Sequence, residues 1–144
     1  MPKILHLLAV AALAAAAHAA PVLAEGDAAK GEKIFNRKAC HKVGDGAKNG
    51  VGPILNNVVG RPAGTVDGFS YSQMNKTAGA NGLVWDETLM LAYLADPNGF
   101  LKQFLTDKGQ LGAGLGATKM LFKLPKEDER KNVIAYLKKF SKAP

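Results

Sequence analysis

Residues 31–44 read GEKIFNRKACHKVG, and they contain the only cysteine of the chain, Cys40, directly followed by His41. A lone cysteine is usually a small buried hydrophobe, so the dipeptide alone is weak support for any site. The residues before it say more, because Gly31 and Phe35 have the spacing that places side chains on one face of a helix. We therefore expect a helix that ends close to the Cys40-His41 pair.

The Cys40-His41 pair matches the second half of the motif C-x-x-C-H, in which two thiols bond to the vinyl groups of haem and the histidine ligates its iron. Arg37 occupies the position of the first thiol. A lone cysteine in an exported protein is inert, bonded to another molecule or used chemically, since it has no internal disulfide partner. The functional question is whether one thiol and a suitable pocket can hold haem.

The N-terminus has the composition of an export signal. Lys3 provides a positive start, and residues 4–17 form an apolar run rich in alanine and leucine that is short for a membrane span. Small residues offer two cleavage points, after Ala19 or after Ala24, and we favour the second because a polar segment follows it. An uncleaved N-terminal anchor is the alternative.

Cleavage after Ala24 leaves residues 25–144, a length that suits one domain with one modest core. Export predicts a periplasmic location. The formal charge of the whole chain is +7, and removal of Lys3 lowers it by one, to +6. A basic surface of this size favours transient binding to an acidic partner. Nucleic-acid binding is disfavoured, because the lysines are scattered and not interleaved with aromatic residues on one segment.

The sequence from residue 25 onward predicts an all-α domain of four or five short helices and long loops, without a strand. The expected helices cover residues 28–38, 72–79, 86–95 and 98–106, and a final one that starts at Pro125 and ends among Lys138, Lys139 and Lys142. Glycine, proline and asparagine crowd residues 44–68, and glycine recurs in 108–117, which indicates loops. So little regular packing suggests that a large apolar group fills the middle of the domain.

The final helix has the clearest pattern of the chain. Its first turn is acidic and its end is rich in lysine, so the charges complement the helix dipole. Apolar residues recur along one side at helical spacing. The expected inner stripe consists of Val133, Ile134, Leu137 and Phe140.

An ordered set of motifs between Gly26 and Lys142 resembles class I cytochrome c, and within it the bacterial cytochrome c2 type. The motifs are Gly31 and Phe35, Cys40-His41, Gly52-Pro53-Ile54-Leu55, Gly60-Arg61-Pro62-Ala63-Gly64, Gly68-Phe69-Ser70-Tyr71, Asn75, Trp85, Leu91-Ala92-Tyr93-Leu94, Gly116-Ala117-Thr118-Lys119-Met120 and Ile134-Ala135-Tyr136-Leu137-Lys138. Each motif alone is weak, whereas their common order is specific.

The resemblance implies the cytochrome c fold around one haem, with iron ligands on both faces. His41 would be one ligand, with its second ring nitrogen held by Pro53. Met120 would be the other, a soft thioether that favours ferrous iron and so raises the reduction potential. Met74 and Met90 are the rival ligands, although both fall on expected helices.

The resemblance also implies polar partners for the haem propionates, since buried charges need hydrogen-bond donors. The residues expected in this role are Arg61, Tyr71, Asn75, Trp85 and Thr118. Without the resemblance, Tyr71 and Trp85 would be read as core aromatics and Arg61 as a solvated charge. Tyr93 would hold the sulfur of Met120 through its hydroxyl. Ordinary pocket wall is expected of Leu55, Leu94, Leu124 and Leu137.

The chain departs from the resembled family at the attachment site. Members of that family carry two thiols separated by two residues, and the segment from Phe35 to Cys40 is one residue short of their pattern. Either a cysteine has been lost between Arg37 and Lys38, or Arg37 has replaced one. We expect haem c held by one thioether through Cys40, because axial ligation of the iron does not depend on the second thioether.

The leading hypothesis is a monomeric, soluble periplasmic electron carrier, not an enzyme. It would shuttle one electron between membrane complexes such as cytochrome bc1 and a terminal oxidase or a photosynthetic reaction centre. Its docking face would include Lys38, Lys42, Lys119 and Lys123. A peroxidase-like protein with loosely held haem and a haem-free relic are the alternatives. A thiol enzyme based on Cys40 and His41 is disfavoured, because neighbours in sequence rarely have the orientation that a nucleophile and its base need.

Overall fold

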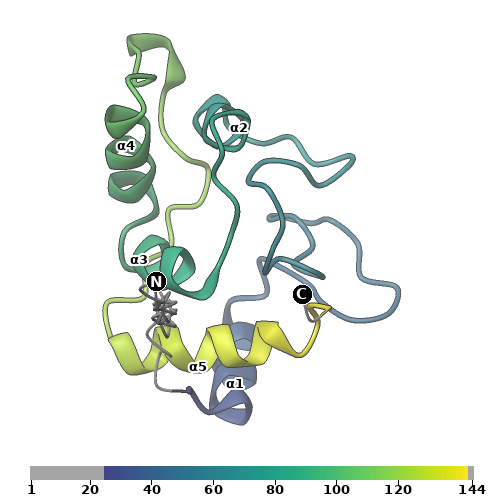
Figure 1. Ribbon diagram of the computed structural model, residues 1–144. Helices are drawn as coiled ribbons and strands as arrows, with labels where there is room; N and C mark the ends of the chain where they lie inside the picture. The colour runs from purple at the N-terminus through teal and green to yellow at the C-terminus, as the bar shows by residue number, and fades with distance from the viewer. Residues whose placement is uncertain (1–24, 143–144) are drawn as a thin grey trace, which may run out of the picture.

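Five α-helices form the regular part of the computed structural model, which describes residues 25–142 (Figure 1). In chain order they are α1 (Ala28–Lys38), α2 (Gln73–Ala80), α3 (Glu87–Ala95), α4 (Pro97–Asp107) and α5 (Glu127–Lys138), with a 3-10 turn η1 (Ala113–Leu115) before α5. Within residues 25–142 the only β pairing is an isolated bridge between Pro62 and Val84. The all-α prediction is therefore confirmed. The predicted export signal and both cleavage points lie outside the described residues.

Each of the first four helices begins after a side-chain cap. Oxygens of Asp27, Ser72, Asp86 and Asp96 accept hydrogen bonds from backbone N–H groups two or three residues ahead, which have no partner within the helix. The predicted bounds of α1 are confirmed. Helices α2 and α3 begin one residue later than predicted, because the capping residue itself is not helical. Helix α4 begins one residue earlier, at Pro97, because Asp96 caps it and proline suits the first helical position.

Helix α5 starts at Glu127, two residues after the predicted start at Pro125, and its cap position, Lys126, makes no side-chain hydrogen bond. The acidic first turn still interacts favourably with the helix dipole. The buried residues of α5 are Val133, Ile134, Tyr136 and Leu137. Phe140, the last member of the predicted stripe, lies after the helix end and packs against the core as a partly buried residue.

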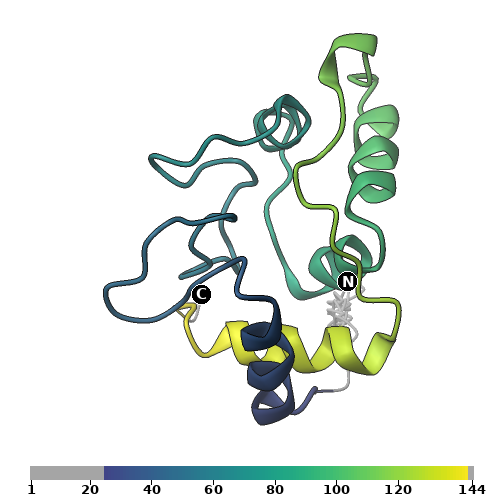
Figure 2. The same ribbon diagram turned by 180° about the vertical axis from the view of Figure 1, so that it is seen from behind.

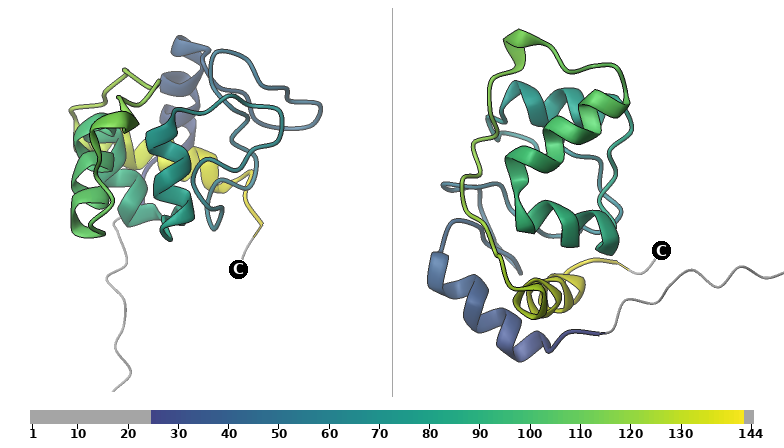
Figure 3. Two further views of the ribbon diagram at one scale, coloured as in Figure 1. Left: turned by 90° about the horizontal axis from the view of Figure 1, so that it is seen from above. Right: turned by 90° about the vertical axis from the view of Figure 1, so that its left-hand side faces the viewer.

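Helices α1 and α5 cross in close contact, in the lower part of Figure 1 and at the foot of the right-hand view of Figure 3. Gly31 lies at the crossing, since a Cβ there would overlap the backbone carbonyl of Asn132. Asn132 Oδ1 also accepts the N–H of Asp27 at 2.7 Å. The rings of Phe35 and Tyr136 meet with centroids 5.5 Å apart. This crossing fixes the last turn of α1 and the residues that follow it.

Helices α2 and α4 lie in the upper part of the molecule and α3 lies just above α5, and Figure 2 shows the chain after α4 running back down to α5. Leu101 and Leu105 of α4 are fully buried, and the exposed fractions of Met74 and Ala78 of α2 are at most 1%. The predicted loop 44–68 carries no helix, as expected, and the predicted loop 108–117 contains only η1. The helices at the ends of the long irregular segments pack against other helices, α1 against α5 and α2 against α4, and so hold the ends of these segments in place.

We expect Gly31→Ala to destabilise the protein by about 1–3 kcal/mol, because the added methyl group overlaps backbone that cannot move without separating α1 from α5. The matched control is Gly112→Ala, at an extended glycine with no atom within 4 Å of the added carbon. Urea unfolding of both variants measures the difference. Equal unfolding midpoints would show that the crossing tolerates a side chain.

Candidate cofactor-binding site

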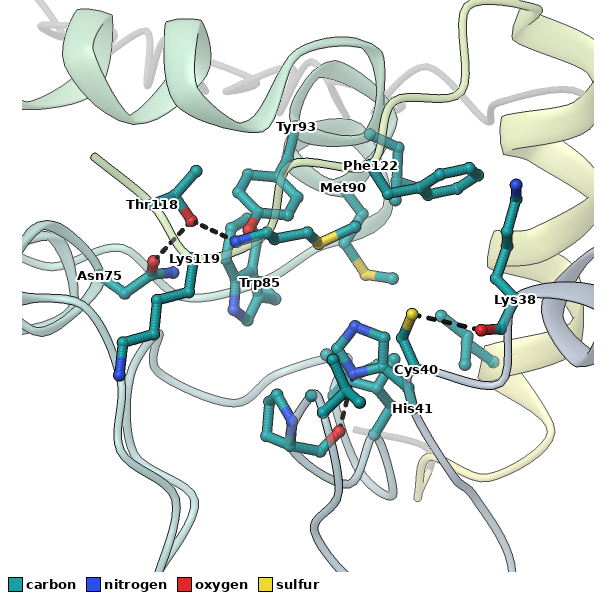
Figure 4. Close-up of a pocket in the computed structure, with 18 of the residues that line it drawn as sticks. Lys38, Cys40, His41, Asn75, Trp85, Met90, Tyr93, Thr118, Lys119 and Phe122 are labelled. Carbon is teal, nitrogen blue, oxygen red and sulfur yellow. Dashed lines mark hydrogen bonds between the residues drawn. The ribbon is translucent and has the colours of Figure 1, made fainter.

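A cavity of about 380 Å³ lies between α1, α3, α5 and the irregular segments (Figure 4). Its volume falls in the range of roughly 300–1,000 Å³ that is usual for small-molecule and cofactor sites. Ile34 and Phe35 of α1 contribute to one side, and Val133 and Leu137 of α5 to another. Most of the wall is apolar, so the cavity suits a large hydrophobic group that carries a few polar substituents.

All ten residues that the sequence analysis assigned to iron ligation or haem binding line this cavity. They are Cys40, His41, Pro53, Arg61, Tyr71, Asn75, Trp85, Tyr93, Thr118 and Met120. The four leucines expected as pocket wall, Leu55, Leu94, Leu124 and Leu137, also line it, which confirms that expectation. Tertiary folding thus gathers residues from positions 40 to 137 around one space.

His41 is held in one orientation. Its Nδ1 lies 2.8 Å from the carbonyl oxygen of Pro53, and because a carbonyl only accepts, Nδ1 carries the proton and Nε2 keeps its lone pair. Burial lowers the pKa of His41. The hydrogen bond to Pro53 raises that pKa and the positive charge of Arg61 lowers it further, and the net change is downward. A Cβ at Gly52 would overlap the imidazole ring. Burial thus favours the neutral form of His41, which is the form that ligates metals.

The backbone before Met120 is tied down by a buried threonine. The Thr118 hydroxyl lies 3.1 Å from Asn75 Oδ1, to which it donates, and it accepts the N–H of Met120 at 3.3 Å. Thr118 is 4% exposed, so few water molecules can compete for these bonds. Asn98 Oδ1 accepts the backbone N–H of Thr118 at 3.3 Å. The segment that carries Met120 is thereby joined to α2 and α4.

The structure separates the rival methionines. Met74 is 1% exposed in the core and does not line the cavity. Met90, on α3, is 5% exposed and does line it, as Figure 4 shows. Only Met90 therefore competes with Met120 for a group bound there.

Arg61 provides a charged group at the cavity. Its Nη1 donates to the carbonyl of Asn56 at 2.8 Å and its Nη2 to that of Ile54 at 3.2 Å. Its Nε is buried and has no hydrogen-bond partner among the described residues. Burial lowers the pKa of Arg61, although a guanidinium stays charged at neutral pH. A buried N–H without a partner is costly, so an acceptor such as a carboxylate fits this position.

The aromatic residues of the site form a packed cluster. Trp85 lies against Tyr93 with centroids 4.7 Å apart, and Tyr93 meets Phe100 edge-on at 5.8 Å. Burial raises the pKa of Tyr93, and the nearby Thr118 and Asn75 side chains offset part of that rise. Burial likewise keeps the tyrosine hydroxyl protonated as a hydrogen-bond donor. Its predicted contact with the sulfur of Met120 stays a prediction.

Two strongly exposed apolar residues at the cavity were not found from the sequence. Val51 is 84% exposed and Leu121 is 80% exposed, although both line the cavity. Phe122 lies beside Leu121 and lines it as well. All three residues lie on irregular segments, where the sequence has no helical periodicity from which burial of an apolar side chain could be predicted. In the sequence, Val51 is marked only as an apolar residue between two glycines, and Leu121 and Phe122 only as apolar residues that follow Met120.

The four lysines expected on a docking face differ in their contacts. Lys119 Nζ donates to the carbonyl of Ser70 at 2.6 Å. Lys123 forms an ion pair with Asp96 at 3.0 Å, so part of its charge is neutralised. Lys38 lies over a phenylalanine ring, and Lys42 is exposed. Lys38 and Lys119 line the cavity, whereas Lys42 and Lys123 do not.

Comparison with known proteins agrees with this geometry. No protein-family model matches the chain. Cytochrome c2 iso-1 of Rhodospirillum centenum is 56% identical over 118 residues, which cover 81% of this chain and 98% of that protein. The solved structure of cytochrome c2 from Rhodospirillum centenum superimposes with a TM-score of 0.78 at 55% identity, over 81% of this chain and 100% of that one. This chain belongs to the cytochrome c2 family.

A cytochrome c2 of Rhodopseudomonas palustris, 57% identical over 112 residues, covers 77% of the chain and 96% of its own length. The cytochrome c fold predicted from the sequence is thus confirmed. Cytochromes c2 are haem-containing electron carriers and not enzymes. None of the helices within residues 25–142 has the length and hydrophobicity needed to cross a bilayer.

We expect Thr118→Val to destabilise the protein by about 1–3 kcal/mol, because valine has the same shape but leaves the N–H of Met120 and the amide of Asn75 without this partner. The control is Thr106→Val, which removes an exposed hydroxyl that donates to Lys102 within α4. The control should change the unfolding free energy by less than about 0.5 kcal/mol. Urea unfolding measures both, and equal losses would contradict the role of Thr118.

Proposed function

We propose that this cytochrome c2 holds haem c in the 380 Å³ cavity and carries one electron at a time between membrane complexes in the periplasm. The observation that carries the proposal is the neutral, oriented His41 in an apolar cavity that Met120 also lines. The resemblance to cytochrome c implies one nitrogen and one sulfur ligand for the haem iron, and His41 and Met120 would supply them. Haem supplies a one-electron ferric/ferrous couple when it is bound.

The cavity also fits the polar edge of haem. Arg61 has a buried N–H without a partner among the described residues, and Tyr71 is a second nearby donor whose pKa is raised by burial. Both line the cavity. A propionate carboxylate satisfies such donors, and the positive charge of Arg61 offsets its negative one. Asn75, Trp85 and Thr118 are the further donors of this proposal.

Two protein ligands leave no open position for a substrate, which suits electron transfer more than catalysis. Pro53 holds the imidazole of His41, and Thr118 holds the backbone of Met120, so both ligands are positioned before haem binds. Little has to move when the charge of the iron changes. A thioether ligand also favours the ferrous state and therefore raises the reduction potential.

Haem attachment tests the proposal directly. Protein secreted by a host that attaches haem c should have the mass of residues 25–144 plus one haem, bonded through Cys40. Cleavage after Ala24 is part of this expectation. In oxidised protein, Met120→Leu should abolish the low-spin, sulfur-ligated visible spectrum and lower the reduction potential, because leucine offers no ligand to iron.

Met90→Leu is the matched control, because Met90 lines the same cavity. It should leave the sulfur-ligated spectrum unchanged. The reverse outcome would make Met90 the ligand, and well-folded protein without haem would refute the proposed function. Rapid reaction of the wild-type protein with peroxide would favour the peroxidase-like alternative.

The proposed partners are acidic surfaces of membrane redox complexes such as cytochrome bc1, a terminal oxidase or a photosynthetic reaction centre. Transient docking through lysines speeds encounter without tight binding. Of the four candidate lysines, Lys38, Lys42 and Lys119 keep their charge free of a carboxylate among the described residues, whereas Lys123 pairs with Asp96. The docking surface therefore consists of the first three.

We expect Lys42→Glu to slow electron transfer with cytochrome bc1 by about three- to tenfold at low salt, since it replaces attraction by repulsion. High salt should reduce the difference. The control is Lys102→Glu, which makes the same change of charge on α4, a helix that contributes no residue to the cavity lining, whereas Lys42 directly follows the lining residue His41. Stopped-flow rates over a range of ionic strengths test this, and equal effects of both variants would place the docking surface elsewhere.

A further inference from the structure

Only one side of α1 borders the cavity. Ile34, Phe35 and Lys38 line it, and their spacing is that of one helical face. Arg37 is exposed and does not line the cavity. A side chain at position 37 therefore points away from any group bound in the cavity, whereas position 38 borders it.

The connection between α1 and the Cys40-His41 pair is unusually tight. Ala39 has φ +49°, a left-handed conformation that costs roughly 1 kcal/mol in a residue other than glycine. Cys40 Sγ turns back to the carbonyl of Lys38 at 3.2 Å. The two ends of this connection are fixed, α1 by its crossing with α5 and His41 by Pro53. The left-handed Ala39 ends α1 and turns the chain toward Cys40 within a single residue.

We propose that the chain lacks one residue between Arg37 and Lys38, and that Lys38 now occupies the cavity-facing position from which a first thiol would reach haem. This inference rests on the proposed function, because it concerns the group that the cavity holds. It decides between the two explanations of the incomplete motif in favour of a lost residue. Arg37 is then a surface residue of α1 and not a replacement for a cysteine.

Lys38 makes a non-covalent contact in place of that missing link. Its Nζ lies 5.1 Å from the ring centroid of Phe122, which joins α1 to the segment that follows Met120. Figure 4 shows Lys38 and Phe122 on the same side of the cavity as Cys40. A cation over an aromatic ring is weakly attractive at exposed positions. The pair closes the edge of the cavity beside Cys40.

A restored thiol would react as each haem thioether does. The S–H adds across a vinyl C=C bond, sulfur bonds to the carbon next to the ring, and the hydrogen ends on the terminal carbon, so nothing is oxidised or reduced. Two variants restore the same motif, Cys-Lys-Ala-Cys-His: a cysteine inserted between Arg37 and Lys38, and the substitution Arg37→Cys. In the insertion variant the new thiol follows Phe35 by three residues and Arg37 is kept, whereas in Arg37→Cys it follows Phe35 by two residues and the arginine is lost.

The test compares both variants with the wild-type protein after secretion by a host that attaches haem c. The pyridine haemochrome spectrum reports how many vinyl groups are saturated, and urea unfolding reports stability. The insertion variant should have both vinyl groups saturated and a higher unfolding midpoint than the wild type, because Ala39 is no longer forced into the left-handed region. Arg37→Cys should either keep its new thiol free or unfold at lower urea than the insertion variant.

An Arg37→Cys protein with two thioethers and a midpoint equal to or above that of the insertion variant would overturn the proposal. A wild-type protein without haem, together with an insertion variant that acquires it, would support the lost residue and refute the proposed function of the present chain. These two failures are therefore distinguishable.

A second measurement does not need the insertion to fold. Lys38→Gln should raise the unfolding equilibrium constant about two- to fivefold, because it removes the cation above Phe122. Lys33→Gln is the control, an exposed lysine of α1 that does not line the cavity. In a Phe122→Leu background the effect of Lys38→Gln should disappear. An undiminished effect in that background would contradict the contact and with it the placement of Lys38.

Discussion

The close crossing of α1 and α5 at Gly31 supports every other feature of the site. Only a glycine lets the helix backbones approach this closely, since a Cβ would overlap Asn132. The crossing places Phe35 and Leu137 on walls of the same cavity. It also sets where the chain leaves α1, and thus where the Cys40-His41 pair begins. A site formed largely of irregular chain depends on this rigid pair of helices.

The cavity explains how so small a domain manages with little regular packing. Its apolar wall leaves the core incomplete without a bound group, and the buried polar atoms around it are arranged for a specific one. Pro53 fixes the proton of His41, Thr118 positions the backbone of Met120, and Arg61 keeps one buried N–H without a partner among the described residues. In the proposed function, haem would complete both the hydrophobic core and the hydrogen bonding, and its binding would couple folding to cofactor retention.

The incomplete attachment motif has a local structural consequence. Between α1 and His41, which are both held in place, Ala39 has the left-handed conformation that we attribute to the proposed missing residue. Of the two proposed iron ligands, His41 lies at the end of that connection and Met120 lies far from it in the sequence. In the proposed function the covalent link and the ligation of the iron are therefore separable, and a change at the end of α1 need not disturb the proposed ligands.

Local signals in the sequence determined the helices, because caps such as Asp27 and Asp86 and the apolar period of α5 act over a few residues. The ordered motifs also identified the ten cavity residues and the family. The start of α5, the pairing of Lys123 with Asp96 and the exposed Val51 and Leu121 at the cavity were not predicted. Only the tertiary structure decided that Met74 lies away from the cavity and that position 38 borders it. Both depend on how helices distant in sequence pack, which no local pattern encodes.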